Sequence, residues 1–375
     1  MFRIELLVYF YIIICISMIF FNVFLILHYR RREQKQETRS RKLLHLVQEQ
    51  AARMEQTGGT LPEKEWERLA KKLYRAEKLL TFDRTLTDLQ QNQPQRAEVY
   101  IGGLLPLFRQ LCWRYRRKEP IQRAYLAYLM GRYAIVEQEK RGGLLHQFLK
   151  ELLFSNNLYC RENALRAYYG TKDGKAVLEA IRILDKNQFF HHGKLLTEGL
   201  MSFQGDHSQL IEMLWAELDA FRVENQVAIL NYIRFRKGGY EARMLALLQD
   251  EKKDPELHFA AIRYLGKYSY PPALDTLLRL ARDRDEARWN YAAISATSLA
   301  SYPGEQTVEV LKRALHHRNW YVRYNAAVSL EAMHLSYVDM ADILTGEDRY
   351  AREMLEYRME ERAQKEREEA VRCQT

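Results

Sequence analysis

A repeat that recurs along the second half of the sequence is the feature that most constrains the fold of this chain. Small or compact apolar residues return there at a nearly constant spacing of roughly 32 residues, a period that is typical of stacked helix pairs. Neither helix of such a pair can bury its apolar side alone. The sequence therefore predicts an all-α fold with an α-α superhelical solenoid. The recurring residues are Ala164, Leu196, Ala228, Ala261, Ala293 and Ala327.

Each repeating unit has the same internal order. A polar turn such as 253–255 precedes a helix with small residues midway, as in 259–265. A short breaker such as 270–272 then separates this helix from a second one, with apolar residues at helical spacing over 274–281. Breakers are otherwise rare, because the 375 residues include only 17 Gly and 8 Pro. This order predicts antiparallel helix pairs joined by short loops.

The last clear unit carries a recognisable motif, with Val322 and Arg323 followed by Ala326, Ala327 and Leu330. This segment resembles the HEAT repeat, in the short bacterial form that is similar to the repeats of phycobilisome lyases. The resemblance covers about 160–345. It implies a surface that binds proteins, and a structural role for Arg323, because this arginine of HEAT repeats bonds to a loop or a neighbouring unit.

The N-terminus predicts a membrane anchor. Residues 6–27 form an unbroken run without a charge, about the length that crosses a bilayer as a helix. The flank after the run is basic, which predicts residues 1–5 outside and the rest in the cytoplasm, as a single-pass inner-membrane protein. A cleaved signal peptide and a buried core helix are the alternatives. The flanking basic residues are Arg30, Arg31, Arg32 and Lys35.

The basic charge lies in the first third of the chain. Residues 28–118 contain 21 Lys and Arg against 11 Asp and Glu, whereas 119–375 contain 36 against 37. Beside a predicted anchor, this excess suggests contact with anionic lipid headgroups and argues against nucleic acid as a partner. The cluster of Arg114, Arg116, Arg117 and Lys118 could still meet phosphate, although a solvated face is the simpler interpretation.

These patterns divide the chain into segments. A basic juxtamembrane helix or linker is expected over 28–59, and a helical N-terminal cap of the solenoid over 60–118. Thr60 and Glu63 are spaced as a capping box, which predicts a helix start at Thr60. HEAT-like repeats are expected over 119–346, and a charged C-terminal helix or tail over 347–375.

No sequence motif suggests catalysis. P-loop, dinucleotide-binding and metalloprotease motifs are missing from the sequence, and its four cysteines lie far apart. The adjacent histidine pairs have the wrong spacing for two ligands on one helix face. We therefore expect no enzyme activity, no cofactor, no metal and no small-molecule substrate.

Protein binding is the function that the sequence favours. Aromatic residues and arginine dominate binding hot spots, and both cluster at the starts of two repeat helices, at Arg288, Trp289, Trp320 and Tyr321. The expected function is a membrane-anchored scaffold for protein partners, with a membrane glycosyltransferase for surface polysaccharide as one candidate. The alternatives are a nucleic-acid-binding protein of the DNA-repair type and, on the resemblance alone, a bilin lyase.

Overall fold

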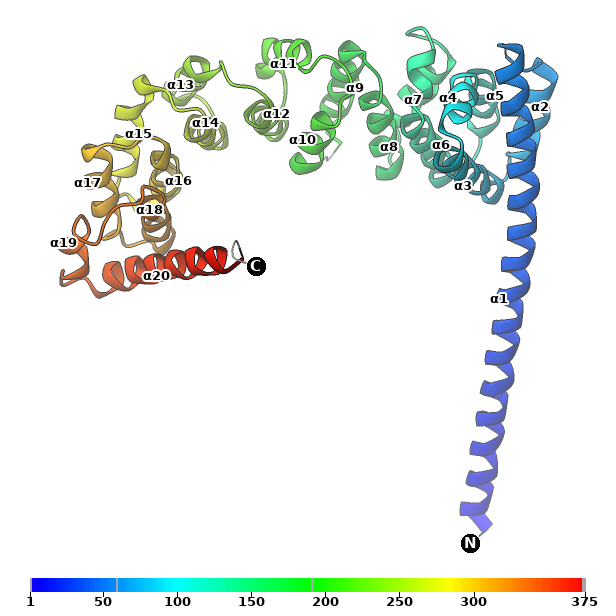
Figure 1. Cartoon of the computed structure of the whole chain (residues 1–375), viewed down its shortest axis with the longest axis horizontal. Helices are drawn as coiled ribbons and strands as arrows, with labels where there is room; N and C mark the ends of the chain where they lie inside the picture. Colours follow the sequence, from blue (N-terminus) through cyan, green and yellow to red (C-terminus); the bar gives the residue numbers. More distant parts are fainter. Residues whose placement is uncertain (1, 59, 190–191, 373–375) are drawn as a thin grey trace. The chain divides into compact units, whose positions relative to one another are not determined.

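The computed structural model describes residues 2–58, 60–189 and 192–372, and all regular structure in these ranges is helical (Figure 1). The predicted all-α fold is thus confirmed for this part of the chain, and the arrangement is compatible with an α-solenoid. The chain divides into two compact units, Met1–Ala180 and Ile181–Thr375.

The first unit consists of one long helix and a series of shorter ones. α1 contacts α3 and α4, α2 contacts α5, and α6 contacts both α5 and α8. The elements are α1 (Phe2–Thr57), α2 (Glu63–Lys72), α3 (Ala76–Asn92), α4 (Pro94–Gly102), α5 (Leu105–Tyr115), α6 (Pro120–Arg132), the 3-10 helix η1 (Ile135–Gln138), α7 (Leu144–Leu153), α8 (Leu158–Tyr169) and α9 (Gly174–Lys186), which crosses the boundary between the units.

α1 is a single helix with no break where the predicted segments 6–27 and 28–59 meet. Its C-terminal part packs against the unit, because Val47 and Ala51 are fully buried and the Tyr100 hydroxyl donates to Gln50 over 2.8 Å. Toward the N-terminus the described apolar side chains are exposed, with Phe20 at 73%. The C-terminal end of α1 therefore belongs to the core of the first unit.

The predicted membrane anchor is contradicted. Among the described residues, no helix has a stretch long and apolar enough to cross a membrane. The predicted run 6–27 also includes the polar residues Ser17 and Asn22. The prediction of a single-pass inner-membrane protein is therefore wrong on this finding. The side chains of Arg30, Arg31, Arg32 and Lys35 lie outside the described residues.

The start of α2 also differs from the prediction. The helix begins at Glu63, its N-cap is Pro62, and no side chain caps it. Thr60 therefore lies before the N-cap position. The first turn instead carries acidic Glu63 and Glu65, which suit the positive end of a helix dipole.

The second unit alternates between two series of helices. α10, α12, α14, α16, α18 and α20 contact one another in succession, while α13, α15 and α17 each pack against the next helix of that series (Figure 1). Their bounds are α10 (Gly193–Met201), α11 (His207–Ala216), α12 (Val223–Arg236), α13 (Glu241–Gln249), α14 (Pro255–Lys267), α15 (Leu274–Ala281), α16 (Trp289–Ser298), α17 (Glu305–Ala314), α18 (Trp320–Ala332), α19 (Ala341–Leu344) and α20 (Arg349–Arg372). Short 3-10 turns join some of them: η2 (Leu218–Ala220), η3 (Pro271–Ala273), η4 (Glu286–Arg288) and η5 (Leu299–Ser301).

The recurring small residues lie where the helices cross. Ala261 and Ala327 are fully buried, and Ala293 is 3% exposed. The approach of the helices is close: a Cβ built on Gly266 of α14 would lie 2.9 Å from the Cα of Ser298 in α16. Small side chains are therefore required at these crossings.

Within the second unit, hydrogen bonds between neighbouring repeats recur with the period of the sequence repeat. The Ser298 hydroxyl donates to the Ile262 carbonyl over 2.9 Å, and the Ser329 hydroxyl donates to the Ala296 carbonyl over 2.8 Å. Ser298 and Ser329 are both buried, so each bond satisfies a hydroxyl that water cannot reach. The bonds fix the register of α14, α16 and α18 along their axes.

Two buried tyrosines form hydrogen bonds to the backbone of the preceding repeat. Tyr264 accepts from the Tyr240 N–H and donates to the Lys237 carbonyl, both over 3.1 Å. Tyr302 does the same one unit later, with the Tyr270 N–H at 3.0 Å and the Leu265 carbonyl at 2.9 Å. Each hydroxyl thus pairs a backbone N–H of a connecting segment with a backbone carbonyl at or near the end of the preceding helix.

Candidate protein-binding face

Two helix starts bring most of the predicted binding residues to one surface of the second unit. α16 begins at Trp289 and α18 at Trp320, and these helices pack side by side. Asn319 caps α18, because its side-chain oxygen accepts from the Tyr321 N–H over 2.9 Å. The cap fixes where the helix begins, and so places Trp320 and Tyr321 in its first turn.

The rings form a continuous aromatic series. Trp289 stacks on Tyr321 with centroids 5.3 Å apart and an interplanar angle of 21°. Tyr321 meets Trp320 edge to face at 5.3 Å, and Trp320 stacks on Tyr324 at 5.0 Å and 14°. We call these four residues, Trp289, Trp320, Tyr321 and Tyr324, the aromatic face.

The aromatic face is open to solvent although its rings are large. Trp320 is 54% exposed and Tyr321 55%, whereas the next residue, Val322, is fully buried. The stacking holds each ring in one position, so little side-chain entropy remains to be lost when a partner covers the face. Exposed, ordered aromatic rings of this kind mark sites of association.

Two arginines border the aromatic face. The Arg358 guanidinium of α20 lies 5.8 Å from the centre of the Tyr324 ring and donates to Glu331 over 2.7 Å. The Arg323 guanidinium lies 5.2 Å from the ring of Tyr350, which is 67% exposed. The carboxylate of Glu331 balances one of the two charges, so this border is only mildly basic.

Arg323 is also held within the unit. Its Nε donates to the His317 carbonyl in the loop before α18. Arg352 forms the same bond to the Gly346 carbonyl over 2.9 Å, again six residues back along the chain. The motif residues Val322, Ala326, Ala327 and Leu330 are all fully buried. The Val-Arg motif therefore lies in the internal packing of this repeat, whereas the exposed surface beside it consists of the rings of Trp320 and Tyr321.

His317 lies beneath the start of α18. Its Nδ1 accepts from the Asn319 N–H over 2.9 Å, and burial lowers the pKa of the ring. The ring nitrogen Nε2 is buried without a described partner. A neutral imidazole is therefore part of the turn that positions the aromatic face.

Arg288 does not join the aromatic face. Its guanidinium lies 5.1 Å from the ring of Tyr291 and 3.5 Å from the Asp283 carboxylate. Tyr291 in turn contacts Phe259 and shares a hydrogen bond with His258 Nδ1 over 2.8 Å. Of the four predicted partner residues, three are thus brought into contact, and Arg288 borders a second aromatic cluster.

Three residues of this surface were not among the predicted site residues. Tyr324 completes the stack, and Arg358 and Tyr350 come from α20. Tyr324 follows Trp320 by one helical turn, a spacing that could have included it. The contribution of α20 depends on the way this helix packs back on α18, for which the sequence has no local signal.

Asp83 is the centre of a buried hydrogen-bond network in the first unit. Asp83 accepts from the hydroxyls of Tyr125 over 2.8 Å and Tyr133 over 2.7 Å, and from Arg132 over 3.2 Å. Burial and the carboxylate together raise the pKa of Tyr133, so the phenol stays protonated and donates. With three donors on it, this carboxylate has no role left as a general base.

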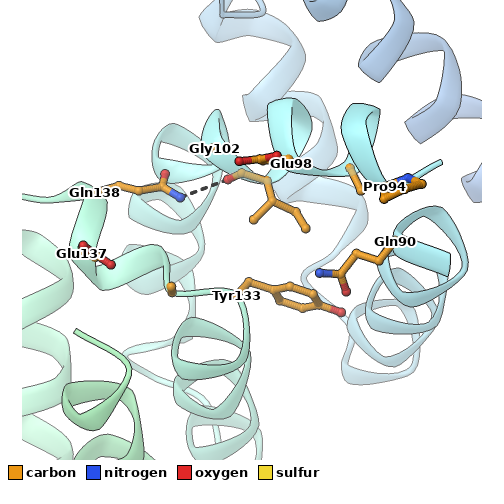
Figure 2. Close-up of a pocket in the computed structure, with 10 residues that line it drawn as sticks. Gln90, Pro94, Glu98, Gly102, Tyr133, Glu137 and Gln138 are labelled. Atoms are coloured by element: carbon orange, nitrogen blue, oxygen red, sulfur yellow. Dashed lines mark hydrogen bonds between the residues drawn. The ribbon is translucent and has the colours of Figure 1, made fainter. Parts of the chain in front are cut away.

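Two hollows lie in the first unit. One, of about 490 Å³, is lined by residues of α3, α4 and the segment after α6, among them Glu98 and Glu137. Beside it, the Gln138 side chain donates to the Ile101 carbonyl over 3.1 Å (Figure 2). The other, of about 550 Å³, is lined by apolar and tyrosine side chains of α3, α6 and α8, including Leu80 and Tyr159. Within the described ranges, no three His, Cys, Asp or Glu side chains are placed to hold a metal ion.

Comparison with known proteins does not assign the chain. No family model matches its sequence. No curated protein matches it either.

Proposed function

We propose that the chain is a protein-interaction scaffold, not an enzyme, and that the aromatic face is where it binds a partner protein. The single observation that carries this proposal is the ordered stack of Trp289, Tyr321, Trp320 and Tyr324, in which Trp320 and Tyr321 are more than half exposed. A stack of this kind costs free energy in water unless another surface covers it.

We further propose that the scaffold is built from HEAT-like repeats. Three features support this: the constant period of the sequence repeat, the buried alanines at helix crossings, and the arginines that bond to the loop carbonyl six residues back. Series of repeats bind partners along extended surfaces, because each unit adds its own first helix to the same side.

The chemistry of the face suggests the kind of partner. The rings are flat and apolar, and the nearby charges include Arg358 paired with Glu331. A partner that inserts an apolar or aromatic side chain between or over the rings would bury them without leaving a charge unpaired. No residue of the face distinguishes one partner protein from another, so a glycosyltransferase partner stays a prediction.

The experiment compares co-purification from the native cells by the wild-type chain and by the double variant Trp320→Ala with Tyr321→Ala. We expect the wild type to retain a stoichiometric protein partner, and the double variant to retain less than about a tenth of it, because truncating hot-spot rings costs about 2 kcal/mol or more each.

The matched control is Phe154→Ala, since Phe154 is 51% exposed and lies in the other unit. Urea denaturation of all three proteins shows whether the double variant is folded. Equal partner recovery by a folded double variant and by the wild type would refute the proposed binding face.

A further inference from the structure

Two loops of the first unit meet at one corner. The Tyr115 hydroxyl at the end of α5 donates to the Leu73 carbonyl after α2 over 2.8 Å. The Lys118 ammonium lies 3.4 Å from the centre of the Tyr74 ring, which also packs edge to face on Tyr115. Residues that are separated by more than forty positions in the sequence therefore share one surface.

This corner is densely basic. We call it the basic corner, and it consists of the cationic side chains on the two loops and the adjoining helix ends: Lys71, Lys72, Arg75, Arg114, Arg117 and Lys118. Only Lys71 forms an ion pair with a described residue, the carboxylate of Glu67 at 2.7 Å. Arg114 lies close enough to Glu67 to lower the pKa of this carboxyl further, after the hydrogen bond from Lys71. The other four cations, Lys72, Arg75, Arg117 and Lys118, form no ion pair with a described residue.

Folding has not neutralised this charge, although carboxylates were available nearby. Arg116, in the same loop, is paired with Glu151 at 3.0 Å, which shows that acidic side chains of α7 can reach this loop. Lys72, Arg75 and Arg117 nevertheless stay exposed and without an ion pair in the described chain. Like charges held together destabilise a fold slightly, so such a cluster is expected where an anionic partner covers it.

We propose that the basic corner binds an acidic segment of a partner protein. This inference rests on the proposed scaffold function and deepens it. Glu77 and Glu119 are exposed and lie close in sequence to Arg75 and Lys118. Acidic residues on both sides of the basic ones in the sequence break the positive charge into a short stretch, whereas a long phosphate backbone needs a continuous basic track. A short run of Asp and Glu side chains fits a basic surface of this limited length, with the Tyr74 ring beside the cations.

The test measures fluorescence anisotropy of a labelled oligoglutamate on the full chain at low ionic strength, beside a labelled oligothymidylate of equal length. We expect the oligoglutamate to bind more tightly and its affinity to fall as salt is added, because exposed charges are screened. The triple variant Lys72→Gln, Arg75→Gln and Lys118→Gln should bind it roughly tenfold more weakly, as three lost exposed pairs imply.

A charge-matched control replaces three exposed cations elsewhere, Lys175→Gln, Lys252→Gln and Arg279→Gln, and should leave the affinity unchanged. The Trp320→Ala/Tyr321→Ala variant should also bind oligoglutamate normally, so that failure of the aromatic face and failure of the basic corner are distinguishable. The proposal is overturned if oligothymidylate binds as tightly or more tightly, if neither probe binds, or if both triple variants weaken binding equally.

Discussion

Removing the Tyr264 hydroxyl is the sharpest test of the way the repeats are joined. This hydroxyl is shared by the Tyr240 N–H and the Lys237 carbonyl, and the Tyr264 side chain is fully buried. Burial raises the pKa of Tyr264 to about 12, so the phenol remains a donor throughout the working pH range. Tyr264→Phe keeps the ring and deletes only the bridge.

The expected cost follows from the two groups that lose their partner. A buried backbone group left without a hydrogen bond costs about 1–3 kcal/mol, and the Lys237 carbonyl lies in a partly exposed loop where water can replace some of the loss. We expect Tyr264→Phe to lower the free energy of unfolding by about 2–4 kcal/mol, measured by urea denaturation followed by circular dichroism. Tyr302→Phe should cost a similar amount, because Tyr302 makes the same bridge one unit later.

Tyr321→Phe is the control, since Tyr321 is 55% exposed and its change should stay within about 0.5 kcal/mol of wild type. If Tyr264→Phe and Tyr302→Phe were as stable as this control, the bridges would contribute nothing and the account of the inter-unit bonds would be wrong.

Two further predictions concern packing and pH. Gly266→Ala should lower the free energy of unfolding by about 1–3 kcal/mol, because the new Cβ would lie 2.5 Å from the Ser298 hydroxyl oxygen. Urea denaturation measures this free energy. An unchanged free energy of unfolding would contradict the close approach of α14 and α16. Burial lowers the pKa values of His146, His207 and His317 below the ordinary 6.5, so the unfolded chain takes up protons first as the pH falls. Stability should therefore decline as the pH falls below about 6.5. A urea midpoint that is higher at pH 5.5 than at pH 7.5 would refute this reasoning.

The control for the glycine substitution is Gly102→Ala, at a glycine with an ordinary φ and nothing within 4 Å of a built Cβ. This variant should retain the wild-type midpoint.

The repeat could be predicted from the sequence because it depends on local, periodic signals. A small residue that must sit at a helix crossing recurs once per unit, so Ala261, Ala293 and Ala327 were identified by spacing alone. The stacking of Trp289 on Tyr321 follows from the same arithmetic. They are 32 residues apart, close to one repeat, so both lie in the first turns of the neighbouring helices α16 and α18.

Other features were beyond the reach of the sequence because they depend on tertiary packing. Nothing local indicates that α20 packs back onto α18 and brings Arg358 to Tyr324. The contact of Arg288 with Tyr291 was also missed, although a spacing of three residues places two side chains on the same face of a helix.

Two predictions in the N-terminal region were wrong. The apolar run 6–27 suggested a membrane anchor by its length and lack of charge, whereas no described helix is long and apolar enough to cross a membrane. The helix that contains the run continues to Thr57 and ends in the core of the first unit. Thr60 has the spacing of a capping box, yet the proline at 62 already holds an extended backbone at the N-cap position.

Site-specific photo-crosslinking measures most directly whether the aromatic face binds a protein. A photoreactive phenylalanine analogue replaces Tyr321 in one sample and Phe154 in another, and both chains are irradiated in the native cells. We expect a discrete protein adduct from position 321 that is missing from position 154 and disappears when Trp320→Ala is added. Adducts of equal yield from both positions, or none from position 321, would contradict the central claim that this face is a protein-binding site.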